Sequence, residues 1–334
     1  MVRRLVLISA AALAGGAPVL AQPQPNNGQA VTDAQAIDST SQAEDLKVRK
    51  DAYDRMTVPV RLSGMGPYRF LVDTGADRTA ISRELASHLN LAAGQQVELH
   101  SMTGASEVST ATVPNLQVTR KPVKGIEAPL LESVNMGADG ILGTDSLALQ
   151  RVEFDFKAQT MSVVPSGAPD FADEPGTILV EARRRNGRLI VTDATANGRH
   201  VTVVVDTGSQ VTIGNEALRR TLQARDLLPE THPVDLVSVT GEHLVGDYMF
   251  LKNLEMGGVE LANLAVVFAP AHTFHQLKLD DKPALLLGMN AMRAFKKVSI
   301  DFANRRLRVI VPESSQLDTQ FASRPWFAIP AVGR

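Results

Sequence analysis

Two aspartates occupy the same short motif, one in each half of a chain of 334 residues. Asp73 and Asp206 each follow an apolar, β-branched run, and each opens the triplet Asp-Thr-Gly. A strand that ends in this triplet can turn tightly at the glycine and project the carboxyl from its end. One copy would mean little, but two copies with the same flanks indicate two carboxyls that meet at one place.

Two carboxyls at contact distance share one proton, because like charges so close together cannot both ionise. Such a pair can act as general base and general acid at once. The simpler alternative is a pair of strand-end turns in which aspartate serves only local hydrogen bonds. The flanks shared by Asp73 and Asp206 favour the catalytic pair.

The residues that follow each aspartate are predicted to support the catalytic loops. They are Thr74, Gly75, Ala76, Thr207, Gly208 and Ser209. The threonines can bond to the backbone, and the glycines give it freedom to turn. A hydroxyl at Ser209 can donate to the neighbouring carboxylate and favour its ionised form, whereas Ala76 cannot. This difference predicts that Asp206 carries the charge and Asp73 the shared proton.

The two motifs resemble those of the aspartic proteases, the clan that contains the retropepsins and pepsins. Residues 73–77, Asp-Thr-Gly-Ala-Asp, are similar to the retropepsin form, and residues 206–209, Asp-Thr-Gly-Ser, to the pepsin form. The resemblance runs from about Val60 to Pro312 and looks like an exported bacterial member with two lobes in one chain. It implies an endopeptidase that activates water with Asp73 and Asp206 and needs no cofactor or metal.

Matching segments recur in the second half of the chain in the same order. The matched pairs are Asp73 and Asp206, Gly104 and Gly241, Gly143 and Gly288, and Phe156 and Phe302. Their separations rise steadily along the chain, as in a duplication with a few loop insertions. We therefore expect an internal repeat and a mostly β protein. Its two retropepsin-like barrel lobes would be related by a pseudo-two-fold axis, each with a short helix.

The composition of each segment predicts how the chain is divided. The segments are a signal peptide at 1–21, a flexible lead or propeptide at 22–56, an N-terminal lobe at 57–165, a linker at 166–177, a C-terminal lobe at 178–312 and a tail at 313–334. Within the lead, residues 43–56 are expected to include a short helix. Ser82 is expected to cap another helix, and residues 215–222 to form a third.

Alternating residues around a glycine predict one hairpin at 97–108 and another at 236–244. The resemblance implies that each hairpin is a flap over the substrate. The flap residues are Met102, Thr103, Gly104, Val239, Thr240 and Gly241. Neither tip carries the tyrosine of the pepsin flap, which favours the retropepsin form with a flap from both lobes. The alternative is that Gly104 and Gly241 are ordinary hairpin glycines.

Composition excludes several classes of function and points to export. The net charge is -2 and aromatic residues make up 4% of the chain, so nucleic-acid binding is not expected. Cysteine is absent, which excludes disulfides, thiol nucleophiles and a lipoprotein anchor. A basic start, an apolar run and a small-residue site at Ala21 predict a cleaved signal peptide. The expected location is the periplasm, with secretion as the alternative and no stable membrane anchor.

Two further clusters and two rival functions complete the expectations. The histidines of His272-Thr273-Phe274-His275 are assigned to a surface loop, and the basic run from Arg183 to Arg188 to a solvated hairpin tip. One rival is a peptide-binding or regulatory module whose dyad is idle. The other pairs two chains to form the dyad. The short linker favours a monomer that forms the dyad within one chain and takes polypeptide as its substrate.

Overall fold

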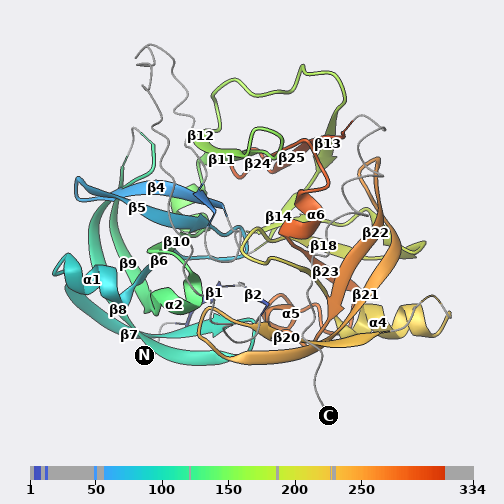
Figure 1. Ribbon diagram of the computed structural model, residues 1–334, viewed down its shortest axis with the longest axis horizontal. Helices are drawn as coiled ribbons and strands as arrows, with labels where there is room; N and C mark the ends of the chain where they lie inside the picture. The colour runs from blue at the N-terminus through green and yellow to red at the C-terminus, as the bar shows by residue number, and fades with distance from the viewer. Residues whose placement is uncertain are drawn as a thin grey trace, which may run out of the picture.

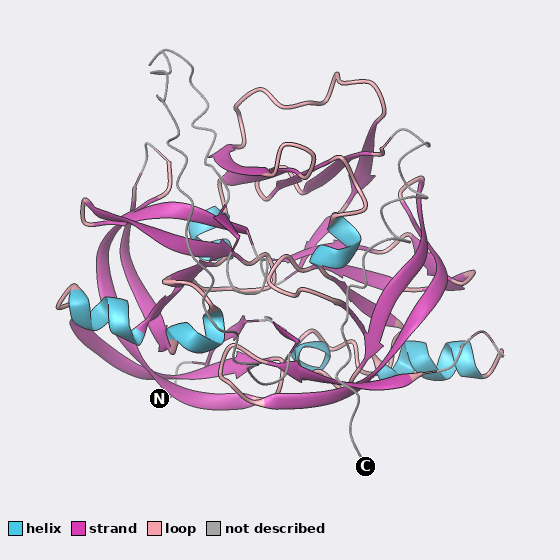
Figure 2. Cartoon of the chain, viewed as in Figure 1, coloured by secondary structure: helices cyan, strands magenta, loops and turns pink. Residues whose placement is uncertain are grey.

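The computed structural model describes residues 4–8, 12–13, 49–50, 56–119, 122–185, 188–225, 227 and 231–312. Two β-rich lobes lie side by side, and a third, smaller sheet spans them on one side (Figure 1). Helices are few and short compared with the strands (Figure 2). The chain is therefore mostly β, as the sequence predicts.

The first lobe is built on a nine-stranded sheet with the order β1-β7-β8-β9-β6-β10-β5-β4-β3. Its strands are β1 (Arg4–Ile8), β3 (Arg49–Lys50), β4 (Met56–Leu62), β5 (Met65–Val72), β6 (Ala80–Ser82), β7 (Ala92–Ser101), β8 (Ala105–Gln117), β9 (Val123–Leu131) and β10 (Gly140–Leu142). Strand β8 also pairs with β4, which curls the sheet toward a barrel.

The second lobe is built on an eleven-stranded sheet with the main order β14-β15-β18-β23-β19-β22-β21-β16-β17, to which β20 and β2 are added beside β21. Its strands are β2 (Ala12–Leu13), β14 (Arg183–Arg185), β15 (Arg188–Val191), β16 (Ala194–Ala196), β17 (Arg199–His200), β18 (Thr202–Val205), β19 (Thr212–Gly214), β20 (His232–Val237), β21 (His243–Met256), β22 (Val259–Phe268) and β23 (Ala284–Leu287).

The third sheet takes strands from both halves of the chain, in the order β12-β11-β24-β25-β13. Its strands are β11 (Gln150–Asp155), β12 (Thr160–Pro165), β13 (Thr177–Glu181), β24 (Lys297–Asp301) and β25 (Arg306–Ile310). The central pairing joins β11 to β24, with Val152 opposite Ile300. The two lobes are thus hydrogen-bonded into one sheet, and both residues of this pair are fully buried in the same core cluster.

Six short helices complete the part of the fold that the structure describes. They are α1 (Arg83–His88), α2 (Ser133–Met136), α3 (Thr144–Leu147), α4 (Glu216–Gln223), α5 (His272–Gln276) and α6 (Met289–Met292). Ser82 caps α1 by accepting a hydrogen bond from the Leu85 amide, and Asn215 caps α4 by accepting one from the Leu218 amide. Both predicted helix starts are confirmed. Among the described residues, no helix has the length and apolar character needed to cross a bilayer.

Two local predictions are wrong. Residues 49–50 form β3 and Met56 begins β4, so the described part of 43–56 is extended rather than helical. The histidines at 272 and 275 lie on α5 rather than in a loop, because the apolar Phe274 and Leu277 bury one side of this turn. Most of the predicted signal peptide and lead, and the whole of the predicted tail from 313, lie outside the described residues.

Candidate active site

Asp73 and Asp206 lie at the ends of equivalent strands, one in each lobe. Asp73 follows β5, which pairs in parallel with β10, and Asp206 follows β18, which pairs in parallel with β23. The amide of Asp73 donates to Leu142 O at 3.0 Å, and the amide of Asp206 donates to Leu287 O at 3.0 Å. Each catalytic loop is therefore held by the end of a neighbouring strand.

A glycine directly after each of those strands lets the two segments touch. A Cβ on Gly143 would lie 2.3 Å from the Arg78 backbone, and a Cβ on Gly288 would lie 2.3 Å from Val211 O. Any other residue at either position would push the catalytic loop away. This close packing explains why a glycine follows two apolar residues in each half, in the apolar-apolar-Gly segments Ile141-Leu142-Gly143 and Leu286-Leu287-Gly288.

Thr74 and Thr207 join the two loops by four reciprocal hydrogen bonds. Thr74 Oγ1 donates to Val205 O at 2.8 Å and accepts from the Thr207 amide at 3.0 Å. Thr207 Oγ1 donates to Val72 O at 2.7 Å and accepts from the Thr74 amide at 3.2 Å. Both threonines are buried. The side chains predicted to support each loop in fact clamp one lobe to the other.

Removing either hydroxyl should destabilise the protein. We expect Thr74→Val or Thr207→Val to lower the free energy of unfolding by about 1–3 kcal/mol, because a buried carbonyl and a buried amide each lose a partner. Urea denaturation measures the change. Thr195→Val is the matched control, since the buried Thr195 Oγ1 makes no hydrogen bond to any described residue. Equal losses in all three variants would contradict this role for the pair.

The two carboxyls face each other across the lobe boundary. A Cβ on Gly75 would lie 2.6 Å from Asp206 Oδ1, so the loop of one lobe rests against the carboxyl of the other. Gly75 donates its amide to Asp73 Oδ1 at 2.8 Å, and Gly208 donates its amide to Asp206 Oδ1 at 3.1 Å. Asp73 and Asp206 are each 1% exposed, so both carboxyls are almost completely shielded from solvent.

Burial raises the pKa of Asp73 well above its ordinary value, and the neighbouring Asp206 raises it further. Amide hydrogen bonds from Gly75 and Ala76 and the cation of Arg188 oppose this rise without cancelling it. The surroundings of Asp73 therefore favour its protonated form. The reason given for a charge on Asp206 is wrong, because the Ser209 hydroxyl donates to Val211 O at 2.7 Å and not to a carboxylate. A charge on Asp206 stays a prediction.

Arg188, at the start of β15, reaches the catalytic loop of the opposite lobe. Its guanidinium donates to Gly75 O from Nε at 2.9 Å and from Nη2 at 2.6 Å, and Nη1 lies 2.9 Å from Asp77 Oδ1. The residue is 1% exposed, so its assignment to a solvated hairpin tip is wrong. The one signal in the sequence for a cation near the first motif is the acidic Asp77, whose counterpart in the second motif is the neutral Gln210.

The tips of the two predicted flap hairpins meet, and each packs a side chain into a core cluster of the opposite lobe. Met102 packs in a cluster of the second lobe with Ile190 and Phe274, whereas Val239 packs in a cluster of the first lobe with Leu71. Both tip residues are fully buried. The two hairpins are therefore fastened to each other, and each is packed against the opposite lobe.

Polar contacts complete the contact between the flap tips. Thr103 Oγ1 donates to the Glu242 carboxylate of the other flap, and Thr240 Oγ1 lies 2.5 Å from Ser238 Oγ in its own tip. Gly241 has a φ of +84° and presses against the Asn135 amide, so a side chain is excluded there. Gly104 has open space around the position of a Cβ and faces no such constraint.

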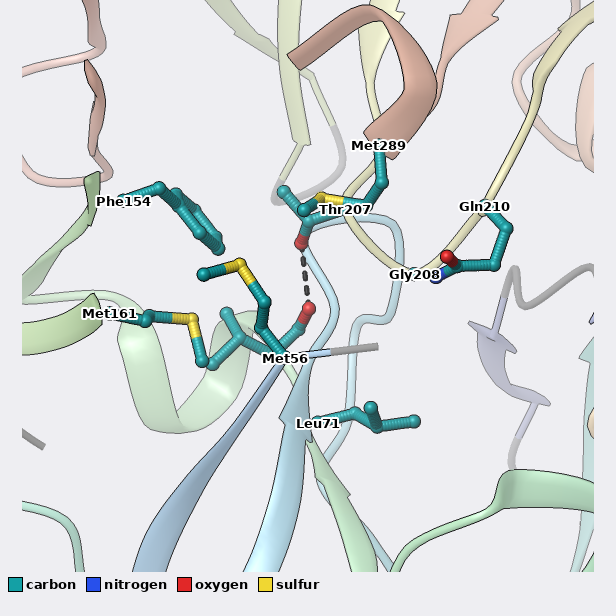
Figure 3. Close-up of a pocket in the computed structure, with 9 residues that line it drawn as sticks. Met56, Leu71, Phe154, Met161, Thr207, Gly208, Gln210 and Met289 are labelled. Carbon is teal, nitrogen blue, oxygen red and sulfur yellow. Dashed lines mark hydrogen bonds between the residues drawn. The ribbon is translucent and has the colours of Figure 1, made fainter. Parts of the chain in front are cut away.

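A small pocket lies behind the catalytic loops, between them and the shared sheet (Figure 3). Its lining is mainly apolar: Met56, Leu71, Val72, Phe154, Met161, Thr207, Gly208, Gln210 and Met289. The Thr207 hydroxyl is already bonded to Val72 O, as the dashed line in Figure 3 shows. Neither Asp73 nor Asp206 is among the residues that line this pocket.

Two family models match the chain, one in each lobe. One is described as gag-polyprotein putative aspartyl protease and matches residues 58–148, and the other is described as aspartyl protease and matches residues 192–291. Each match spans one of the two Asp-Thr-Gly motifs. The chain belongs to the retropepsin-like aspartic proteases. It carries two such lobes, and no curated protein matches it.

Other candidate groups are not brought to the site of this aspartic protease. Within the described residues, no group of three or more His, Cys, Asp or Glu side chains could hold a metal ion. Asp139 and Asp145 serve the backbone and a hydroxyl: Asp139 accepts from the Arg69 amide at 2.7 Å, and Asp145 from Thr79 Oγ1 at 2.8 Å. Both carboxyls therefore stabilise the first lobe through hydrogen bonds.

Proposed function

We propose that the chain is an aspartic endopeptidase in which Asp73 and Asp206 activate a water molecule against a peptide bond. The observation that carries this proposal is the pair of buried carboxyls, one from each lobe, that the reciprocal bonds of Thr74 and Thr207 hold together. The raised pKa of Asp73 supports it, because one proton shared by two carboxyls is what this chemistry requires.

The dyad divides the work between a base and an acid. Ionised Asp206 takes a proton from the water, whose oxygen attacks the peptide carbonyl carbon while Asp73 gives its proton to the carbonyl oxygen. In the second step the proton held by Asp206 passes to the amide nitrogen, and the C–N bond breaks. Asp73 recovers a proton from the hydroxyl, so a carboxylic acid and an amine leave, and the dyad returns to its starting state.

An extended polypeptide is the proposed substrate. The flap strands β7 and β20 both accept a further strand: β7 pairs in parallel with β1, and β20 pairs in antiparallel with β2. A peptide can bind in the same way, through its backbone. The parallel pairing at β7 and the antiparallel pairing at β20 fit one extended peptide, because the pseudo-two-fold axis makes the two flap strands run in opposite directions. A single straight strand that crosses the axis must run parallel to one flap and antiparallel to its counterpart.

We also propose that the enzyme acts after export, in the periplasm or outside the cell, as a monomer. Export is supported by the basic and apolar start of the sequence, and the lack of cysteine does not contradict it. The monomer is supported by the dyad itself, since both carboxyls and both threonines come from one chain. Sedimentation of the chain that begins at Gln22 measures its state of association.

Cleavage of a denatured protein mixture tests the proposed function. The chain from Gln22 is incubated from about pH 3 to about pH 8, the range in which a carboxyl pair can hold one proton. Mass spectrometry of the products should show new ends inside the substrate chains, as an endopeptidase produces. A folded chain that releases no fragments at any pH would instead favour the peptide-binding module with an idle dyad.

The raised pKa of Asp73 predicts how activity depends on pH. Turnover needs the proton on Asp73, so the alkaline limb of kcat/KM should lie well above the ordinary aspartate pKa of about 4. Between those two values the folded state holds a proton that the unfolded state has lost, so the free energy of unfolding should fall as pH rises. A pH–rate profile measures the limb, and a limb near pH 4 would contradict the assignment.

A further inference from the structure

Three polar side chains from the two lobes converge beside the first flap tip, away from the dyad. His100 lies on β7 of the first lobe, and His272 and Gln276 lie on α5 of the second. His100 Nδ1 is 2.9 Å from His272 Nε2, and the Gln276 amide nitrogen is 3.1 Å from the first atom and 3.2 Å from the second. The three atoms therefore form a nearly regular triangle.

Hydrogen bonds alone do not account for this triangle. Glu98 Oε1 lies 3.0 Å from His100 Nε2 and holds the proton there, which leaves a lone pair on His100 Nδ1. If His272 Nε2 is protonated, it competes with Gln276 for that lone pair. If it is not, two imidazole lone pairs face each other at 2.9 Å. In either case one of the three contacts has no matching hydrogen and lone pair.

We propose that His100 Nδ1, His272 Nε2 and the Gln276 amide oxygen form a binding site for a borderline divalent cation such as Zn²⁺. A half turn of the amide exchanges its nitrogen for its oxygen, two atoms of nearly the same size, so the oxygen can take the place of the nitrogen in the triangle. Ligands bonded at about 2.0–2.1 Å in a tetrahedron are about 3.3 Å apart, so small outward shifts admit the ion. Because the third donor is an amide, the set differs from the usual His, Cys and carboxylate sites.

The surroundings of the three donors also suit an ion. His272 and Gln276 are four positions apart on one helix, the spacing that places two ligands on the same face. The contact of Glu98 with the far nitrogen of His100 is the arrangement that orients a metal-binding imidazole. His272 and Gln276 are partly exposed, so solvent can reach the site and complete the coordination.

Binding there would fasten the first flap to the opposite lobe. His100 lies two residues before Met102, whose carbonyl accepts a hydrogen bond from the His272 amide at 2.8 Å. A cation held by both lobes would make flap opening harder and slow the entry of substrate. This consequence rests on the proposed peptidase function, whereas binding of the ion does not.

Calorimetric titration of the full chain with Zn²⁺ tests the site. We expect one ion per chain, loss of binding in His100→Asn and His272→Asn, and roughly tenfold or greater weakening in Glu98→Gln. His243→Asn is the matched control, because exposed His243 pairs with Asp235 on the second flap in a similar acid–histidine contact. Unchanged binding in the first three variants, binding lost in the control, or no binding at all would overturn the proposal.

Nitrogen-15 spectra of the wild-type chain give a test that does not depend on how any variant folds. Zn²⁺ should shift Nδ1 of one histidine and Nε2 of another, and shifts confined to other histidines would overturn the site. Peptide hydrolysis is then measured with and without the ion. Binding in a chain without turnover supports the site and overturns the peptidase. Binding that leaves turnover unchanged supports the site and overturns its effect on the flap.

Discussion

Replacing Asp73 or Asp206 with asparagine should lower kcat by about a thousandfold, within the range of 10²–10⁴ for loss of a general acid or base. Asparagine keeps the shape and one oxygen of the side chain, so it can still accept the hydrogen bond from the backbone amide of Gly75 or Gly208. The amide cannot accept or hold the proton that the pair must share. Either substitution therefore disables both steps of the reaction.

The double variant should lose no more activity than either single one. Two residues that act as a unit are not additive, because removing one leaves the other nothing to work with. Cleavage of a peptide is measured for both single variants and the double variant. If the activity of the double variant fell by the product of the losses in Asp73→Asn and Asp206→Asn, the two carboxyls would not serve one site.

The chain offers its own control for these substitutions. Asp145 and Asn290 occupy equivalent places after the apolar-apolar-Gly segments, and each accepts a hydrogen bond from a threonine of its lobe. The second lobe is therefore already built with an amide at this position. Asp145→Asn should keep its activity, which separates the loss of a dyad carboxyl from the general effect of replacing a hydrogen-bonded, partly buried acid.

Replacing Arg188 with methionine should have the largest effect on stability, about 3 kcal/mol. Breaking a buried ion pair costs about 3–5 kcal/mol, and the lower value applies because about a third of the Asp77 side chain stays exposed. Gly75 O also loses two donors. Arg83→Met is the matched control, since its pair with Glu132 is exposed and should contribute less than about 1 kcal/mol.

Arg188→Met should also move the alkaline limb of the pH–rate profile upward. The guanidinium lowers the pKa of Asp73, so its removal raises that pKa further. Asp77→Asn is a second variant that keeps the cation and the bonds to Gly75. A lower stability with an unmoved limb in Arg188→Met would reduce Arg188 to a purely structural residue.

Local patterns were enough to predict much of the fold. The helix starts at Ser82 and Asn215 follow from capping, which is a matter of a few neighbouring residues. The strands that lead to Asp73 and Asp206 follow from apolar runs that end in a tight turn. Features of this kind depend on short stretches of sequence, so sequence alone indicates them.

Contacts between distant segments could not be predicted in this way. Arg188 lies in a basic run that is typical of a solvated tip, and only its contact with Gly75 in the other lobe explains why it is buried. Strand β24 has the sequence pattern of an ordinary strand, and this pattern does not predict that it pairs with β11. The approach of His100 to His272 likewise depends on how the two lobes pack.

The unequal halves of the site have a consequence for the direction of the substrate. A peptide has an amino end and a carboxyl end, and a perfectly symmetric cleft would bind it equally well in both orientations. Here Asp77 stands opposite Gln210, and Met102 opposite Val239. On the proposed function, the two orientations of a bound polypeptide would therefore differ in energy. The enzyme would then favour one orientation and discriminate between the residues on either side of the bond that is cut.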